Sequence, residues 1–257
     1  MNDTTSPATS SATEVKKLGW LAALHVYLEP ASWRMLCLGF SAGLPLLLVL
    51  GTLSFRLREA GIDRSTIGFL SWVGLAYGFK WAWAPLVDRL SIPLLTPLLG
   101  RRRSWLLLAQ ISIVVGLLGM AGSNPQVALT PLVGFAVLVA FGSATQDIAL
   151  DAFRIESAQA RLQGVLAASY QTGYRLAMIW AGAGVLWIAA RVAGTDNTAY
   201  QHAAWQSAYL VMAASMSLGV LTVLLSPEPA QRELPPARNA AEWLRGALVE
   251  PFADFIR

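Results

Sequence analysis

Two aspartates lie one helical turn apart at the end of a long apolar segment. The segment TPLVGFAVLVAFGSAT is followed by QDIALDAFR, which contains Asp147 and Asp151. On a helix, such residues share one face about 6 Å apart along the axis. Two close carboxylates in a poorly solvated site raise the pKa of at least one of them, and a nearby cation lowers it again. We therefore predict that this pair takes up and releases a proton near neutral pH. The alternative, that the carboxylates only anchor the helix end at the membrane interface, stays open, above all for Asp151.

Two cations also lie within apolar segments. Lys80 follows Tyr77 by one turn, and Arg175 has Gln171 one turn before it and Tyr174 beside it. Because an ionisable group in a bilayer costs at least about 2.5–3.5 kcal/mol, it usually faces a cavity or a partner. An arginine can bind a carboxylate through two parallel hydrogen bonds. We predict a substrate site containing these five residues. An ion pair with the aspartates is the alternative, and the two are compatible because a substrate can replace an internal counter-ion.

Membrane-spanning helices must position these residues. The 257 residues are 55% hydrophobic and only 13% charged, and their mean hydropathy is +0.52. Soluble domains carry roughly twice this charged fraction. Ten tryptophans also suit membrane interfaces. The composition predicts an all-α integral membrane protein, and the single cysteine, Cys37, excludes an intrachain disulfide.

A spanning helix needs about 20 mostly apolar residues. This length predicts six spans, at Met35–Phe55, Thr66–Val87, Ser104–Gly122, Leu129–Asp151, Gly164–Ala190 and Trp205–Leu225. The expected organisation is a disordered tail (1–17), an interfacial helix (18–34), a six-helix transmembrane bundle (35–225) and a polar, proline-rich cytoplasmic linker (226–257).

The basic residues predict the orientation. With the amino terminus inside, 13 of the 19 Lys and Arg residues face the cytoplasm and 4 face outside, while Lys80 and Arg175 lie within spans. The four outside residues are Arg56, Arg58, Arg64 and Arg191. Both termini are therefore expected in the cytoplasm.

A basic cytoplasmic loop joins the second and third expected spans. It begins at Asp88 and Arg89 and ends at the run Arg101, Arg102 and Arg103. An aspartate at a helix end beside several arginines can form charge pairs that hold a cytoplasmic gate, although such loops also arise from topology alone. His25 and His202 lack metal-ligand spacing, and we expect no metal and no cofactor. The AGAG run at 181–184 predicts close helix packing.

Four segments together resemble a known transporter family. They are FSAGLPLLL, STIGFLSWVGLAYGFKWAWAPLVDR, GRRRSWLL and SATQDIALDAFRIES. The loop from Asp88 to Arg103 resembles the major facilitator signature, with LSIPLLTPLL inserted. The combination resembles the AmpG branch of that superfamily, the muropeptide permeases, from about Met35 to Pro229.

The resemblance implies a function. Permeases of this type import N-acetylglucosamine-anhydro-N-acetylmuramyl peptides across the inner membrane by symport with protons, for peptidoglycan recycling, and in some bacteria the cargo induces β-lactamase. By this resemblance the aspartates belong to the proton and substrate pathway, and Gln146 offers an amide to sugar or peptide groups. The family has a second six-helix half, so we expect this chain to form the amino-terminal half. Substrate sites in such transporters lie between the halves.

Three alternatives stay open. The first is a facilitator for another anionic substrate, such as acetyl-CoA, which would use the same cations. The second is an intramembrane prenyltransferase, whose Asp-x-x-x-Asp motif binds Mg²⁺ and diphosphate. Here Ser143 stands where that motif favours Asn, and a second Asp-rich motif is absent from the sequence. The third is a membrane signalling protein without transport, which leaves Lys80 and Arg175 without a role.

Overall fold

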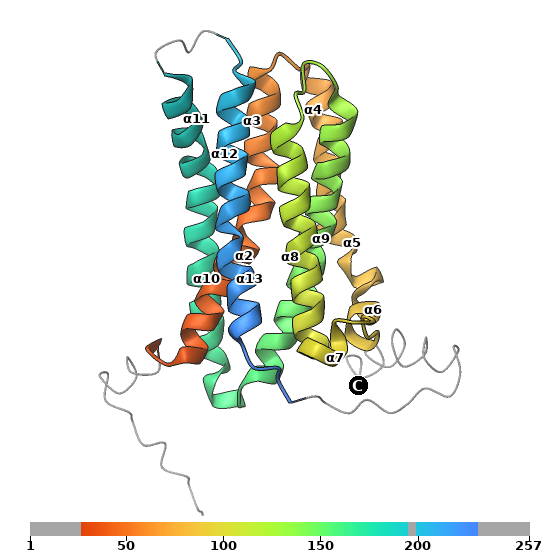
Figure 1. Cartoon of the computed structure of the whole chain (residues 1–257), viewed down its shortest axis with the longest axis vertical. Coiled ribbons are helices and arrows are strands. Elements are labelled where there is room, and N and C mark those ends of the chain that lie inside the picture. Colours follow the sequence, from red (N-terminus) through yellow and green to blue (C-terminus); the bar gives the residue numbers. More distant parts are fainter. Residues whose placement is uncertain (1–26, 195–198, 231–257) are drawn as a thin grey trace, which may run out of the picture.

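The computed structural model describes residues 27–194 and 199–230, and these residues form helices joined by short turns and loops. Figure 1 shows an elongated bundle whose long helices run roughly along one axis. Five helical segments within the described residues are long and apolar enough to cross a membrane: Pro30–Glu59, Arg101–Gly122, Leu129–Ser157, Gln163–Ala193 and His202–Leu225. They confirm the expected all-α membrane architecture. The expected tail at 1–17, and residues 18–26 and 231–257, lie outside the described residues.

Most of these segments contain a local irregularity. The first joins α2 (Pro30–Val49) to α3 (Gly51–Glu59), and residues 30–34, expected in an interfacial helix, already belong to α2. The second and third are single helices, α8 (Arg101–Gly122) and α9 (Leu129–Ser157). The fourth consists of α10 (Gln163–Ile179), a π-helical turn (Trp180–Gly184) and α11 (Val185–Ala193), and the fifth of α12 (His202–Ser215) and α13 (Ser217–Leu225).

The second expected span, Thr66–Val87, is not a continuous helix. It is divided into α4 (Arg64–Leu70), a 3-10 turn (Ser71–Gly74), α5 (Leu75–Phe79), a second 3-10 turn (Lys80–Ala82) and α6 (Ala84–Arg89). The expected count of six continuous spans is therefore wrong, because the described residues contain five. We call Arg64–Arg89 the broken segment. In Figure 1 it runs from α4 at the upper end of the bundle to α6 at the lower end, and α5 and α6 pack against α9.

The residues of the broken segment explain its interruptions. Gly74 and Gly78 weaken a helix by about 1 kcal/mol each relative to alanine. Pro85 has no backbone N–H, and in a continuous helix its ring would clash with the carbonyl group of Trp81. Pro85 instead occupies the first turn of α6, where an N–H donor is not needed. The apolar composition suggested a continuous span, but Gly74, Gly78 and Pro85 disfavour a continuous helix.

Asp63 fixes the start of the broken segment. Its carboxylate accepts hydrogen bonds from the Thr66 amide at 2.9 Å and from the hydroxyl groups of Ser65 and Thr66. These hydrogen bonds lower the pKa of Asp63 to about 2. Because the folded-state pKa is depressed, this cap is fully present above the ordinary pKa of 3.8 and is lost only as the pH falls toward 2. Asp63 therefore stays ionised at physiological pH.

Glycines bring α2 and α10 into close contact. A Cβ atom on Gly39 would lie 2.1 Å from the carbonyl oxygen of Tyr170, and one on Gly173 would lie 2.0 Å from that of Leu36. Without a hydrophobic driving force between helices in lipid, small residues that let backbones approach are a main source of helix association. One face of α10 is thereby fixed on α2.

The π-helical turn contains the AGAG run, and α3 contacts it. The hydroxyl group of Thr52 donates a 2.8 Å hydrogen bond to the carbonyl oxygen of Ala181, which is fully buried. A π-helical turn leaves carbonyl groups without their usual partners, and in a membrane these need a donor from within the protein. Close packing was expected at this run, and the structure adds this hydrogen bond between spans.

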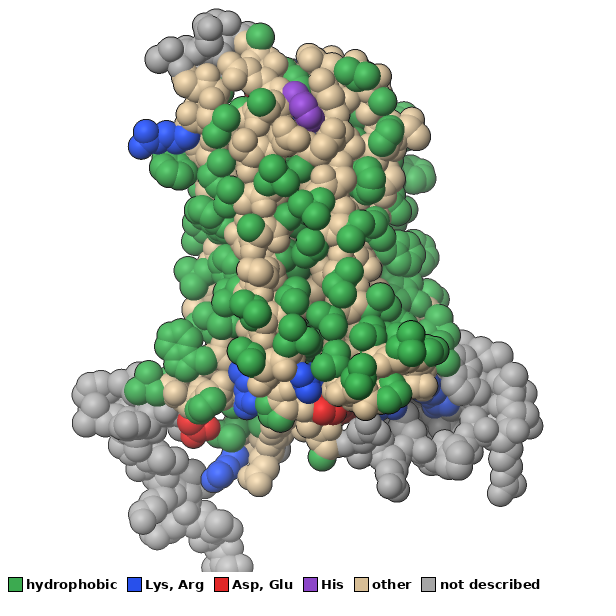
Figure 2. All heavy atoms as spheres, viewed as in Figure 1, with side chains coloured by type: hydrophobic (Ala, Val, Ile, Leu, Met, Phe, Trp, Pro, Cys, Tyr) green, Lys and Arg blue, Asp and Glu red, His purple; other side chains and the backbone are tan. Residues whose placement is uncertain are grey.

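The surface of the bundle differs between its length and its lower end. On the face seen in Figure 2, hydrophobic side chains cover the length of the bundle, and Lys, Arg, Asp and Glu gather near its lower end. The exposed large hydrophobic residues include Phe69, Trp72, Phe141, Ile179 and Trp187. An apolar band of this extent is expected where lipid surrounds a protein, and it supports a multi-pass membrane protein.

The positions of basic residues predict the membrane orientation of the bundle. A reporter fused after Arg58, at the upper end of the first span, should lie outside, and one fused after Arg103, beyond the broken segment, should lie inside. The reason is the excess of Lys and Arg on the cytoplasmic side. Paired alkaline phosphatase and fluorescent protein fusions measure this directly, and the opposite pattern of activities would rule out the orientation.

The contact between α2 and α10 predicts a stability difference between two glycines. Gly39→Ala should lower stability by about 1–3 kcal/mol, because the added methyl group overlaps the α10 backbone. Gly134→Ala is the matched control, since a Cβ there meets no atom within 4 Å. Thermal unfolding in detergent compares the two variants. Equal unfolding midpoints would show that α2 and α10 are not held by this contact.

Candidate functional site

An ion pair joins the broken segment to α9 within the bundle. The Lys80 Nζ atom lies 3.8 Å from Oδ2 of Asp147. The side chain of Asp147 is 18% exposed and that of Lys80 is 40% exposed, so the aspartate is the more enclosed partner. The second oxygen of Asp147, Oδ1, is buried and has no hydrogen-bond partner among the described residues. A carboxylate with a loosely held cation and an unsatisfied oxygen is suited to accept a proton or a new donor.

The break in the helix determines where Lys80 stands. The residue begins the second 3-10 turn, between α5 and α6, and not the interior of a regular helix. Asp147, by contrast, lies inside the 29-residue helix α9. One partner therefore sits on a rigid element and the other on a segment whose backbone is interrupted on both sides.

Three tyrosines lie near Asp147. The Tyr77 hydroxyl group faces Ser143 and lies within electrostatic range of Asp147, as do Tyr170 and Tyr174 on α10. The Tyr170 and Tyr174 rings pack at a centroid distance of 5.9 Å. Side chains from α5, α9 and α10 thus form one polar and aromatic surface, which we call the central site. The predicted residues Lys80, Tyr77, Asp147 and Tyr174 come together there.

The two aspartates have different environments. Asp151 is more exposed than Asp147, with 53% of its side chain accessible, and its Oδ1 lies 3.4 Å from the Arg154 guanidinium, one turn further along α9. Among the described residues, Asp151 forms no ion pair with Lys80, the partner of Asp147. An exposed pair three residues apart contributes little to stability. Asp151 therefore resembles an anchor at the helix end more than a member of the central site.

Arg175 and Gln171 lie on the exposed surface of α10. Both side chains are exposed, and within the described part of the chain Arg175 forms no ion pair with either aspartate. Tyr174 lies within electrostatic range of both Asp147 and Arg175, so the arginine is near the central site. The four ionisable residues expected within the spans do not converge as one neutral set.

Gln146 lies in the helix packing, one residue from Asp147. It is fully buried, and its Nε2 donates a 2.9 Å hydrogen bond to the Ser41 hydroxyl group, which also accepts one from Gln110 at 3.3 Å. The Oε1 atoms of both glutamines lack partners among the described residues. This polar contact joins α2, α8 and α9 directly behind the site. A substrate-binding role for Gln146 stays a prediction, and Ser41 was not predicted to take part.

The lower end of the bundle carries a charge cluster around Arg102. Its guanidinium donates to both oxygens of Glu156 at 3.0 and 2.7 Å, and to Asp88 at 2.7 Å. The predicted residues Asp88 and Arg102 therefore meet, and Glu156, at the end of α9, was not predicted. The side chains of Arg102 and Glu156 are 8% and 16% exposed, so their contact is largely desolvated, whereas Asp88 is 44% exposed. The cluster ties α6, α8 and α9 together.

Two further contacts complete this end. Glu228 accepts hydrogen bonds from the backbone amides of Arg102 and Arg103 at 2.8 and 3.1 Å, which places a carboxylate at the amino terminus of α8. Arg103 in turn donates to the carbonyl oxygens of Val223 and Leu224 at the end of α13. Arg89 ends α6, and the buried Nε of Arg101 lacks a partner among the described residues.

The upper end has a buried arginine that the sequence did not reveal. Arg56 was expected in an outside loop, but α3 continues to Glu59 and the Arg56 side chain is fully buried. Its guanidinium donates to the carbonyl oxygens of Met120 and Ser123 at 2.7 and 2.6 Å, where α8 ends. It also lies 5.2 Å from the Tyr209 ring centroid. The carboxyl end of a helix attracts a cation, so Arg56 closes the upper end of α8.

Among the described residues, no group of three or more His, Cys, Asp and Glu side chains is arranged to hold a metal ion. The chemistry that the central site offers consists of a carboxylate, a primary amine and phenol groups. These can hold a proton and bind charged or hydroxylated molecules.

Comparison with known proteins relates this arrangement to transporters. A family model described as "Acetyl-coenzyme A transporter 1" matches residues 32–127. "Anhydromuropeptide permease" of Escherichia coli is 39% identical over 233 residues, which cover 91% of this chain and 44% of that protein. "Putative transporter AmpG 4" of Rickettsia felis is 32% identical over 226 residues, which cover 88% of this chain and 52% of that protein.

The aligned region contains the central site and the charge cluster, since it covers nearly the whole chain. The chain spans about half the length of these curated relatives. The resemblance expected from the four sequence segments is confirmed. The chain is homologous to the AmpG-type permeases over this shared length.

Proposed function

We propose that this chain forms part of a transporter that imports anhydromuropeptides across the bacterial inner membrane, driven by protons. Homology to proteins named as permeases supports the class of activity. The observation that supports the mechanism is the ion pair between Lys80 and Asp147, which sits where a rigid helix meets an interrupted one. The proposal places peptidoglycan recycling downstream of this import and makes the protein a transporter rather than an enzyme.

The central site offers the groups that such a substrate needs. A muropeptide carries peptide carboxylates, amides and sugar hydroxyl groups. In the proposal, Lys80 and the exposed Arg175 bind carboxylates, and the tyrosines contact the sugars through their rings and hydroxyl groups. Gln171, also exposed on α10, offers an amide. Gln146 would join only if its bond to Ser41 opened. A second six-helix half would supply the opposite wall.

In this proposal the substrate carboxylate and Asp147 compete for Lys80, and this competition couples substrate binding to proton binding. While Lys80 lies 3.8 Å from Asp147, the aspartate is stabilised in its charged form. A substrate carboxylate that recruits Lys80 removes that cation, and the enclosed Asp147 is then more stable when protonated. Substrate and proton thus occupy the site together. Asp151, further along α9, would pass the proton toward the lower end or only anchor the helix.

The cluster around Arg102 serves as the cytoplasmic gate in this proposal. It holds α6, the last part of the broken segment, against α8 and α9. Movement of the broken segment during alternating access would stretch the Asp88–Arg102 contact and leave the bidentate contact with Glu156 in place. The proposal also places both termini in the cytoplasm, because the basic lower end faces that side.

A facilitator for an acyl-coenzyme A is the second candidate function. The family model described as an acetyl-coenzyme A transporter matches residues 32–127, which include Lys80, Asp88 and Arg102. Its anionic substrate would bind the same cations. Uptake of labelled muropeptide in the presence of excess acetyl-CoA separates the two. Competition by acetyl-CoA at comparable concentration would favour the second candidate.

Asp147→Asn should separate uphill transport from exchange. The change keeps the shape of the side chain but removes its proton, so accumulation against a gradient should fall about 100-fold while counterflow survives. The reason is that exchange needs no net release of a proton. Proteoliposomes containing a transporter in which this chain is joined to a second six-helix half provide both measurements.

Asp151→Asn is the matched control on the same helix face, and its accumulation should fall less than tenfold. If Asp147→Asn accumulates substrate as the parent does, the aspartate is structural and the coupling mechanism is wrong.

Arg175→Lys should weaken substrate binding more than coupling. Lysine keeps the charge but loses the planar pair of donors, so we expect KM to rise about tenfold with little change in the ratio of protons to substrate. Concentration series of uptake in the same vesicles measure KM. An unchanged KM would remove Arg175 from the substrate site.

A further inference from the structure

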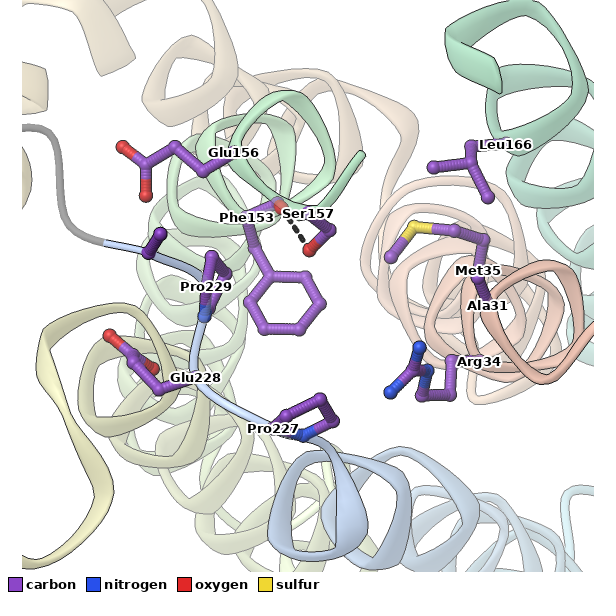
Figure 3. Close-up of a pocket in the computed structure, with 11 residues that line it drawn as sticks. Ala31, Arg34, Met35, Phe153, Glu156, Ser157, Leu166, Pro227, Glu228 and Pro229 are labelled. Carbon is purple, nitrogen blue, oxygen red and sulfur yellow. Dashed lines mark hydrogen bonds between the residues drawn. The ribbon is translucent and has the colours of Figure 1, made fainter. Parts of the chain in front are cut away.

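A cavity at the lower end of the bundle lies apart from the central site, although Glu156 of the charge cluster lines it. Its volume is about 280 Å³, and it lies between the starts of α2 and α10, the end of α9 and the residues after α13. Figure 3 shows Arg34 extending from α2 toward the middle of this cavity, opposite Phe153. Met35 and Leu166 form apolar parts of the wall. The cavity therefore presents one cation beside apolar side chains.

Arg34 has no partner of its own. Within the described residues its guanidinium forms no hydrogen bond and no ion pair, although its side chain is only partly exposed. A guanidinium has five N–H donors in a planar fork that fits a phosphate group. It is more weakly hydrated than an ammonium group, so it gives up water readily to an anion. The N–H donors of Arg34, which have no partner among the described residues, thus point to an anionic ligand.

The two acids that line the cavity do not neutralise Arg34. In Figure 3 the carboxylates of Glu156 and Glu228 are turned away from it. Glu156 is held by the Arg102 guanidinium, and Glu228 by the backbone amides at the start of α8. Both carboxylates are therefore held by other donors, and Arg34 is the cation in the wall of the cavity. Ser157, also in the wall, uses its hydroxyl hydrogen for the carbonyl oxygen of Phe153.

The position of the cavity matches the headgroup layer of a membrane. Trp33, next to Arg34, is 53% exposed, and Tyr27 and Leu28 at the same end of α2 are also exposed. Exposed aromatic residues at the start of a span mark the level of lipid headgroups. Basic pockets between helices on the cytoplasmic side are suited to anionic headgroups. An apolar wall beside the cation then suits the glycerol and the first acyl carbons.

We propose that this cavity binds the phosphate group of an anionic phospholipid, with Arg34 as its main ligand. The bound lipid would also touch Pro227 and Pro229, which flank the Glu228 that caps α8. Lipid binding would thereby stabilise the lower end of the bundle. The proposal does not depend on what the protein transports.

Native mass spectrometry of the purified full chain tests this site. Phosphatidylglycerol should be retained in preference to phosphatidylcholine, and Arg34→Gln should reduce its retention at least about tenfold, because a charge-assisted contact is lost. Arg161→Gln is the matched control. It removes the same charge from an exposed position between α9 and α10, outside the cavity, and should change retention less than twofold.

Each outcome decides the proposal. Equal losses of lipid retention in the two variants would show that surface charge alone attracts the lipid. Unchanged retention in Arg34→Gln would show that Arg34 does not bind the lipid. Either result overturns the proposal. Glycerol 3-phosphate is the soluble probe: if it raises the unfolding temperature through Arg34 as strongly as the lipid does, the ligand is a free phosphate ester and the lipid is excluded. Should Arg34→Gln fail to fold, Arg34→Lys should retain binding between that of the parent and that of a lipid-free control.

Discussion

A charge inside a bilayer must be matched by a partner from within the protein, and this requirement organises the structure at three levels. In the middle, Lys80 and Asp147 pair across two elements. At the lower end, Arg102 bonds to Asp88 and Glu156. At the upper end, Arg56 forms no ion pair among the described residues and is held by carbonyl oxygens where α8 ends. The partners at the two ends have short, directional contacts, whereas the central pair is longer and leaves one carboxylate oxygen unsatisfied. The least satisfied pair is thus the one beside the tyrosines.

The broken segment allows the position of Lys80 relative to Asp147 to change. A continuous helix would hold Lys80 at a fixed position relative to α9. Here two 3-10 turns flank α5, and Lys80 begins the second of them. Short helices with few internal hydrogen bonds open at lower free energy than long ones, so this segment is the natural place for local rearrangement. By contrast, α2 is fixed to α10 by backbone contact at Gly39 and Gly173, and the Ser41, Gln110 and Gln146 contact fixes α2 to α8 and α9. Rigid and adaptable parts therefore meet at Asp147.

Much of this arrangement was predictable because bilayer chemistry restricts sequence strongly. Apolar length identified five spans and the membrane class, and the rarity of buried charge singled out Lys80 and Asp147. The break in the second span was not predicted, since apolar composition gives no measure of how Gly74, Gly78 and Pro85 interrupt a backbone. Arg56 was missed because a charge near a span end suggests a loop, and only the end of α8 shows what compensates it. Glu156 and Glu228 were missed for a similar reason: each acts on α8 from a segment remote in sequence. The uneven environments of Asp147 and Asp151, one turn apart, likewise depend on which neighbouring helix faces each residue.

The central claim is that substrate displaces Lys80 from Asp147 and that the aspartate then takes a proton. Proton movement on addition of substrate tests it most directly. Vesicles without an imposed gradient, containing this chain joined to a second six-helix half, are mixed with anhydromuropeptide in a weakly buffered medium while the external pH is recorded. The account predicts that the medium becomes more alkaline as muropeptide enters, and that Asp147→Asn abolishes this change while muropeptide still equilibrates. Entry of muropeptide with no pH change in the parent, or the same pH change in the variant, would contradict it.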